Sequence, residues 1–392
     1  MTTTQGRGTQ ERGHRIGVLD VLRGIALLGM FLVHFKDRSY DSPGIGEIYK
    51  TFVYWFFDER FWATFGILFG VGFAIQFRNA ARRGEPYVAK YLRRMAALAV
   101  FGFIAEAFFG FNVLLSYAIW GIPLILFRNW RTPALIVALL LSATSHTIYS
   151  NARRSYIVST AGQAQFAAQS DSVREYNRIH NEKYRKAQDS KSYREVVKSR
   201  IDHMKWFYRQ WFSFLPVNTL TLFLIGLLGL RLGIFERPEE YRRLIVALMT
   251  FGVVSWVAET WLIPNGYGIL RSMWLSLTYI GAVLLLVAHD KRWLDRLSAF
   301  GYTGRMALTN YMIQIAILDL LFSNYALGLS IHPLVGLLGA IVLFAIDAML
   351  SKWWLSNHRY GPLEWVWRSF TYWRIPEHQS KTKIKSLENG SI

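Results

Sequence analysis

Apolar segments alternate with short polar segments along most of the chain. A helix that crosses a bilayer needs about 20 residues, because the hydrocarbon core is about 30 Å thick. Only 18% of the residues are charged, whereas soluble domains have about 25%, so a large soluble protein with buried helices is the disfavoured alternative. We predict an all-α fold, a polytopic membrane helix bundle of about ten transmembrane helices, at residues 18–35, 61–77, 95–109, 113–127, 133–149, 212–230, 244–263, 269–288, 306–322 and 333–350.

The same pattern divides the chain into four regions. Residues 1–150 and 211–352 form two membrane halves of five helices each, joined by an outer amphipathic loop at residues 151–210. This loop either caps a cavity or serves as a passive linker. Residues 353–392 form a cytoplasmic interfacial helix and a disordered tail, since Trp, Tyr and Arg at the start of this region favour the headgroup level.

The charge balance supports a membrane protein with an inward N-terminus. Lys and Arg outnumber Asp and Glu by 45 to 26, for a net charge of +19. With both termini in the cytoplasm, most of the basic clusters fall in cytoplasmic loops, as the positive-inside rule requires. The excess of positive charge then needs no nucleic acid as a partner. The chain has no cysteine, which excludes disulfides, thiolate metal sites and a cysteine nucleophile.

Two glycine-rich stretches, residues 69–73 and 224–229, look superficially like phosphate-binding loops. Neither follows a strand or precedes the lysine that such a loop needs. Glycines in membrane helices more often allow two helices to approach closely, and we predict this role for both stretches. The sequence also has no zinc motif, so we expect no metal.

Ionisable residues inside predicted spans are candidates for function, because a charge in a bilayer is costly unless it is paired or hydrated. The first span has Asp20 and Arg23 near its inner end and His34 near its outer end. Arg23 and His34 share a helix face, about 20° apart in azimuth and roughly 16 Å apart along the axis. A cation near the cytoplasm and an imidazole near the outside suit a reaction whose substrates arrive from opposite sides. Alternatively, Asp20 and Arg23 form an i,i+3 ion pair, and His34 only bonds a neighbouring helix.

Other predicted spans also contain polar residues. Glu106 lies well inside the third span and needs a buried partner, for which His34 and Arg271 are candidates. Asn310 and Gln314 share one face of the ninth span, where amides bind a substrate or tie helices together. The candidate substrate-binding residues are Asp20, Asn112, Asn310, Gln314, Glu259 and Arg271.

Several stretches resemble known families. The sequence LDVLRGIA at residues 19–26 resembles the opening motif of bacterial integral membrane acyltransferases and of relatives of the lysosomal heparan glucosaminide acetyltransferase. From about residue 15 to 372, the chain is similar to the YeiB family, whose C-terminal half is a domain of unknown function (DUF418). This similarity rests on FGILFGVGF at 65–73, LRLGIF at 230–235, GRMALTNY at 304–311 and GPLEW at 361–365.

The resemblance implies transfer of an acyl group from cytoplasmic acyl-CoA, such as acetyl-CoA, to a hydroxyl or amine at the membrane or outer face. It implies that His34 is the general base and that Glu106 orients its imidazole. The donor's phosphates would be held by Arg23, Arg93, Arg94 and Arg305. It further implies a multi-pass protein of the bacterial plasma (inner) membrane, with a small molecule or an envelope glycan or lipid as acceptor. Exposed aromatic and glycine faces would permit a homodimer.

Two other functions stay open. A membrane transporter or exporter would relay protons or hold a cationic substrate with the carboxylates of Glu106, Glu259, Asp319 and Asp347. The two halves show no evident inverted repeat, which disfavours transport. A non-catalytic scaffold or sensor would use the outer loop.

Overall fold

The regular elements of the protein are helices, as the apolar pattern predicts. The computed structural model describes residues 4–111, 113–214, 218–262 and 269–375. Its elements are α1 (Thr4–Arg38), α2 (Ile45–Phe56), α3 (Arg60–Arg82), α4 (Val88–Phe109), α5 (Val113–Leu124), η1 (Ile125–Asn129), α6 (Thr132–Gln188), α7 (Tyr193–Phe214), α8 (Asn218–Leu232), α9 (Arg242–Leu262), α10 (Ile269–His289), α11 (Arg292–Arg296), α12 (Ser298–Arg305), α13 (Ala307–Phe322), α14 (Pro333–Asn357) and α15 (Pro362–Tyr372).

Each predicted apolar segment lies wholly or largely on one or two of these helices. By length and composition, three described segments could each cross a membrane: Gly17–Arg38, Ile45–Arg82 and Pro333–Asn357. The number rises to five if each of two bent helix pairs counts as one span. The all-helical fold is therefore confirmed, whereas ten spans and cytoplasmic termini stay predictions.

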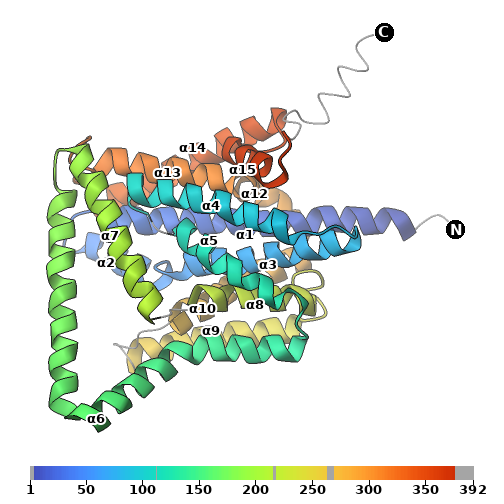
Figure 1. Ribbon diagram of the computed structural model, residues 1–392. Coiled ribbons are helices and arrows are strands. Elements are labelled where there is room, and N and C mark those ends of the chain that lie inside the picture. The colour runs from blue at the N-terminus through green and yellow to red at the C-terminus, as the bar shows by residue number, and fades with distance from the viewer. Residues whose placement is uncertain (1–3, 112, 215–217, 263–268, 376–392) are drawn as a thin grey trace.

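Most of the helices run along one common direction (Figure 1). The N-terminal part of α1 and the short helix α15 lie at one end of this bundle, which we call the terminal end. At the opposite end, α6 and α7 extend beyond the other helices as a hairpin, and we call this the hairpin end. Under the predicted topology, the terminal end faces the cytoplasm.

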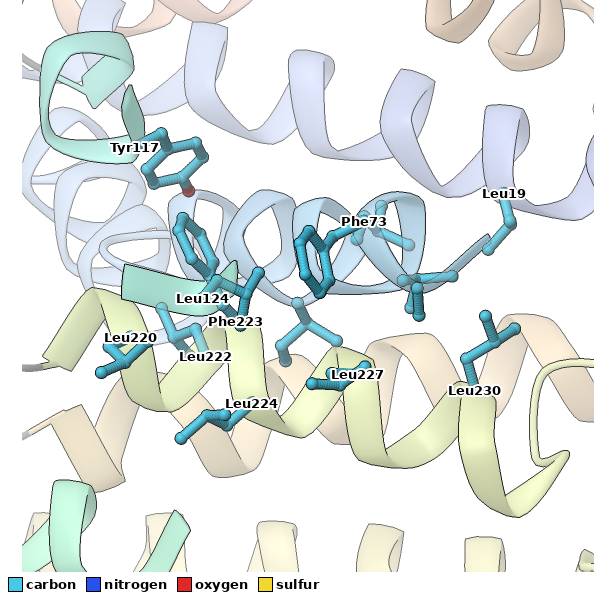
Figure 2. Packing of buried hydrophobic residues seen from close by; sticks show 14 of the residues in the cluster. Leu19, Phe73, Tyr117, Leu124, Leu220, Leu222, Phe223, Leu224, Leu227 and Leu230 are labelled. Carbon is cyan, nitrogen blue, oxygen red and sulfur yellow. The ribbon is translucent and has the colours of Figure 1, made fainter. Parts of the chain in front are cut away.

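Close packing of α3 against α8 forms part of the core. A Cβ atom on Gly70 would overlap the carbonyl oxygen of Phe223, and one on Gly226 would overlap the carbonyl oxygen of Ile67. The rings of Phe69 and Phe223 stack with centroids 4.5 Å apart. Figure 2 shows Phe223 and leucines of α8 together with Phe73 of α3, all members of one buried cluster. The predicted packing role of both glycine-rich stretches is confirmed.

The predicted outer loop consists of two long helices. α6 continues from the fifth apolar segment across residue 151, so no loop begins there, and the helix has a break at Gly162, where φ is 85°. Its segments Thr132–Ser145 and Thr147–Gln188 differ in direction by 47°. After a short turn, α7 returns toward the bundle (Figure 1). The region predicted as a loop is thus a hairpin of two helices.

Candidate functional site

The motif at residues 19–26 places two arginines together through close helix packing. Asp20 and Arg23 form an ion pair, with Oδ1 and Nη1 2.7 Å apart. A Cβ atom on Gly24 would overlap the backbone of α12, and one on Gly304 would overlap the carbonyl oxygen of Asp20. Arg305 follows Gly304, and its charge lies within range of the Asp20 carboxylate. The packing of Gly304 on Asp20 thus brings Arg305 to the same part of α1 as the Asp20–Arg23 pair.

A cavity of about 330 Å³ adjoins this pair, lined by residues of α1, α3, α4, α5, α12, α13 and α15 and of the turn before α15. We call it the arginine cavity. Its charged lining residues are Arg23, Arg94, Arg305, Arg368 and Glu364. Three of the four arginines predicted to hold donor phosphates thus meet here. The fourth, Arg93, instead lies over the ring of Trp373 at 5.8 Å.

The cavity is basic toward the terminal end, which we call its mouth, and mainly apolar toward the hairpin end, which we call its deep end. On α1, the lining runs from Arg23 to Met30, and these seven positions span roughly 10 Å. The deep end is lined by Val113, Leu114 and Tyr117 of α5 and Tyr311 of α13. A charged mouth and an apolar floor suit a ligand with an anionic end and an uncharged arm.

Helix α15 is attached to the bundle beside the mouth of the cavity. The carboxylate of Glu364 accepts hydrogen bonds from the backbone nitrogens of Leu308 and Thr309, at 2.7 and 3.1 Å, in the first turn of α13. A carboxylate at a helix N-terminus is stabilised by the orphan N–H groups there. Burial nevertheless raises the pKa of Glu364. Trp367 lies against Arg94, with its Nε1 donating to the Arg94 carbonyl at 2.9 Å.

His34 lies one helical turn beyond Met30, on the same face of α1. Its ring contacts Phe111, with centroids 4.5 Å apart. Phe111 lies just before Val113, which lines the deep end of the arginine cavity. The predicted general base is therefore close to the apolar end of the cavity, on the side of the hairpin.

Glu106 is buried on α4 and accepts a hydrogen bond of 3.1 Å from Tyr208 of α7. Tyr208 was not among the predicted partners, which were His34 and Arg271. Glu106 thus connects α4 to the hairpin, and its predicted role in orienting the imidazole stays a prediction.

The amides on α13 connect helices. Asn310 donates to Ser351 Oγ at 2.8 Å, and Gln314 donates to Asp347 Oδ2 at 2.9 Å. Both bonds join α13 to α14, as the helix-tying interpretation expects, and neither amide is among the residues that line the arginine cavity. Their role in binding a substrate stays a prediction. The other predicted substrate-binding residues, Asn112, Glu259 and Arg271, have side chains outside the described part of the chain.

A second cavity, of about 420 Å³, lies between α3, η1 and α8. Two of its arginines are engaged by protein groups. Arg78 pairs with Glu236 at 2.7 Å, and Arg231 donates to three backbone carbonyls of residues 127–130. These two cations bind groups in the connecting segments around the second cavity and are not directed at a ligand. The arginine cavity is therefore the better candidate for a functional site.

Comparison with known proteins finds two family models that each match part of the chain. Residues 15–173 match the model described as "Heparan-alpha-glucosaminide N-acetyltransferase, catalytic", and residues 229–374 match "Protein of unknown function (DUF418)". The chain is thus similar to a membrane acyltransferase in its first half. The arginine cavity takes Arg23 and Arg94 from the first matched region and Arg305 and Arg368 from the second.

Three relatives support the predicted resemblance to the YeiB family, which is confirmed. The chain is 28% identical over 420 residues to the uncharacterized protein YxaH of Bacillus subtilis, covering 98% of this chain and 100% of the relative. It is 28% identical over 373 residues to an uncharacterized 39.9 kDa protein of Bacillus acidopullulyticus, covering 91% and 94%. It is 26% identical over 391 residues to the uncharacterized protein YeiB of Escherichia coli, covering 90% and 95%. No solved structure gives a significant match.

Proposed function

We propose that the protein is a membrane acyltransferase that moves an acyl group from acyl-CoA to an acceptor hydroxyl or amine. The observation that carries this proposal is the arginine cavity, which has four arginines at one end and an apolar floor at the other. Acyl-CoA combines a phosphorylated nucleotide with a thin, uncharged pantetheine arm. The match of residues 15–173 to an acetyltransferase model favours an acetyl group.

The residues of the cavity fit such a donor. Guanidinium groups bind phosphate through paired N–H donors, which makes arginine well suited to the nucleotide end. The described lining carries four arginines against the single carboxylate of Glu364, which is engaged by α13. The pantetheine arm would follow the lining of α1 from Arg23 to Met30, and so bring the thioester toward His34.

In the proposed reaction, His34 accepts the proton of the acceptor hydroxyl or amine as general base. The acceptor oxygen or nitrogen forms a bond to the thioester carbonyl carbon, and the carbon–sulfur bond breaks. The proton held by His34 then passes to the sulfur, so that free CoA leaves as a thiol. In this proposal, Glu106 lies in the same region as His34, and its carboxylate accepts a hydrogen bond from Tyr208.

The transporter alternative has less support. Asp319 forms an ion pair with Arg200, and Asp347 accepts a hydrogen bond from Gln314. Both contacts favour a role in fastening helices rather than in relaying protons, because a paired carboxylate gives up its charge only at a cost.

The proposal is tested by release of free CoA from acetyl-CoA, with purified protein in vesicles and an extract of bacterial envelope as the source of acceptor. We expect release by the wild type and loss of at least about a hundred-fold in His34→Ala, as for removal of a general base. Lys198→Ala, at an exposed position of α7, is the control and should keep full activity. Release no faster than from empty vesicles would contradict the proposal.

A further inference from the structure

Two arginines of the arginine cavity are held by aromatic rings. The guanidinium carbon of Arg94 lies 3.7 Å from the ring centre of Trp367, and that of Arg368 lies 4.3 Å from the ring centre of Tyr360. Neither arginine forms an ion pair with a carboxylate in the described part of the chain. A cation over a ring face keeps the N–H donors at the edge of the guanidinium plane for another ligand.

Other arginines near this end are held differently. Arg23 is paired with Asp20, and Arg78 is paired with Glu236. The donors of Arg231 are directed to backbone carbonyls. These guanidinium groups already have anionic or carbonyl acceptors, whereas Arg94 and Arg368, like Arg305, form no ion pair in the described part of the chain.

Arg94 and Arg368 line the same cavity, and the Arg94 guanidinium lies over the ring of Trp367, the residue next to Arg368 in the chain. Two like charges in a partly buried cavity repel each other, and this cost is offset when an anion binds between them. A phosphate group accepts hydrogen bonds from two guanidinium groups at once. The pair thus has the arrangement of a phosphate site.

We infer that Arg94 and Arg368 form a phosphate clamp for the nucleotide end of the donor, and that α15 is the element that supplies it. This inference rests on the proposed function and deepens it, because it gives the DUF418-matched region a role in recognising a phosphorylated donor. Glu364 fixes α15 to α13, and Trp367 fixes it to α4, so that Arg368 has a defined position at the mouth. The site therefore prefers a nucleotide-bearing thioester over one without phosphates.

The test is calorimetric titration of acetyl-CoA into the purified full chain, with Arg368→Gln and Arg94→Gln as the variants. We expect each variant to weaken binding about ten-fold or more, through loss of charge-assisted hydrogen bonds. Arg359→Gln is the matched control, because Arg359 also lies near the Tyr360 ring, at 5.3 Å, but is exposed and does not line the cavity. It should bind as the wild type does.

A second measurement needs no variant. Adenosine 3′,5′-bisphosphate, which has phosphates but no pantetheine arm, should compete with acetyl-CoA for the wild-type protein. Failure to compete, or equal affinity of Arg368→Gln and wild type for acetyl-CoA, would overturn the clamp and leave the proposed function standing. If the wild type does not bind acetyl-CoA, the proposed function itself fails.

Discussion

Arg200 of α7 and Asp319 of α13 form a buried ion pair, with Nη2 and Oδ1 2.7 Å apart and side chains only 2% and 5% exposed. Arg200 also donates to the backbone carbonyl of Phe108 on α4 and to the Gln188 side chain on α6. One side chain thus joins both helices of the hairpin to two helices of the bundle. The hairpin is therefore docked on the bundle.

We predict that Arg200→Ala lowers the free energy of unfolding by about 3–5 kcal/mol, because it leaves the charge of Asp319 buried without its cation. Thermal unfolding of the detergent-solubilised protein measures this change. Lys198→Ala is the control, since Lys198 is exposed on the same helix. Equal transition temperatures for the two variants would show that the ion pair does not hold the hairpin.

The contact between α3 and α8 should tolerate no side chain at Gly226. A Cβ atom there meets the carbonyl oxygen of Ile67, which cannot move without shifting α3. We expect Gly226→Leu to destabilise the fold by at least about 1–3 kcal/mol, seen as a lower transition temperature. Gly17→Ala should have little effect, because its Cβ would meet only a side-chain carbon of Leu294 at 3.7 Å. A Gly226→Leu protein as stable as Gly17→Ala would contradict the packing.

The hairpin should lose stability in acid. His180 and His203 have ring nitrogens 3.1 Å apart, and Tyr184 and Trp206 stack on them. Burial lowers the pKa of both histidines from the ordinary value of 6.5, and Lys183 lowers that of His180 further. The folded hairpin thus favours the neutral imidazoles. The contribution of the two histidines to folding stability is therefore complete above their pKa in the unfolded chain. It is lost as the pH falls below that pKa and the imidazoles become protonated.

We therefore expect the transition temperature to fall between about pH 7.5 and 5 by a few degrees more in the wild type than in His203→Gln. The measurement is thermal unfolding at a series of pH values. Parallel curves for the two proteins would mean that the histidine pair does not titrate within the hairpin.

Tyr208 should act on the reaction through Glu106. Removal of its hydroxyl in Tyr208→Phe takes away the hydrogen bond to the Glu106 carboxylate. We expect kcat to fall about ten-fold, with the affinity for acetyl-CoA unchanged, because Tyr208 does not line the arginine cavity. The exposed Tyr176 provides the control Tyr176→Phe. A weaker affinity with unchanged kcat would place Tyr208 in donor binding instead.

Much of the arginine cavity could be predicted from the sequence, because arginine near membrane depth is costly and so draws attention. Arg23 was identified in this way, whereas Arg94 and Arg305 were expected as phosphate ligands from the resemblance to acyltransferases. Arg368 was missed because Trp, Tyr and Arg are common at the headgroup level, so its helix looked like an ordinary interfacial segment. Its position against Arg94 depends on a contact across 273 residues, between Trp367 and the Arg94 carbonyl.

The hairpin contacts were missed for a related reason. Tyr208 and Glu106 are 102 residues apart, and Arg200 and Asp319 are 119 apart. Helical periodicity predicts the face of one helix and not which helices meet. A basic stretch outside the membrane gives no sign that one of its arginines is buried.

Titration of acetyl-CoA into the wild type and into Arg305→Gln tests most directly whether the arginine cavity binds acyl-CoA. Arg305 is the last residue of α12 and lines the mouth of the arginine cavity. We predict saturable binding by the wild type and about ten-fold weaker binding by Arg305→Gln with an unchanged transition temperature. No binding by the wild type, or equal binding by both proteins, would contradict the account.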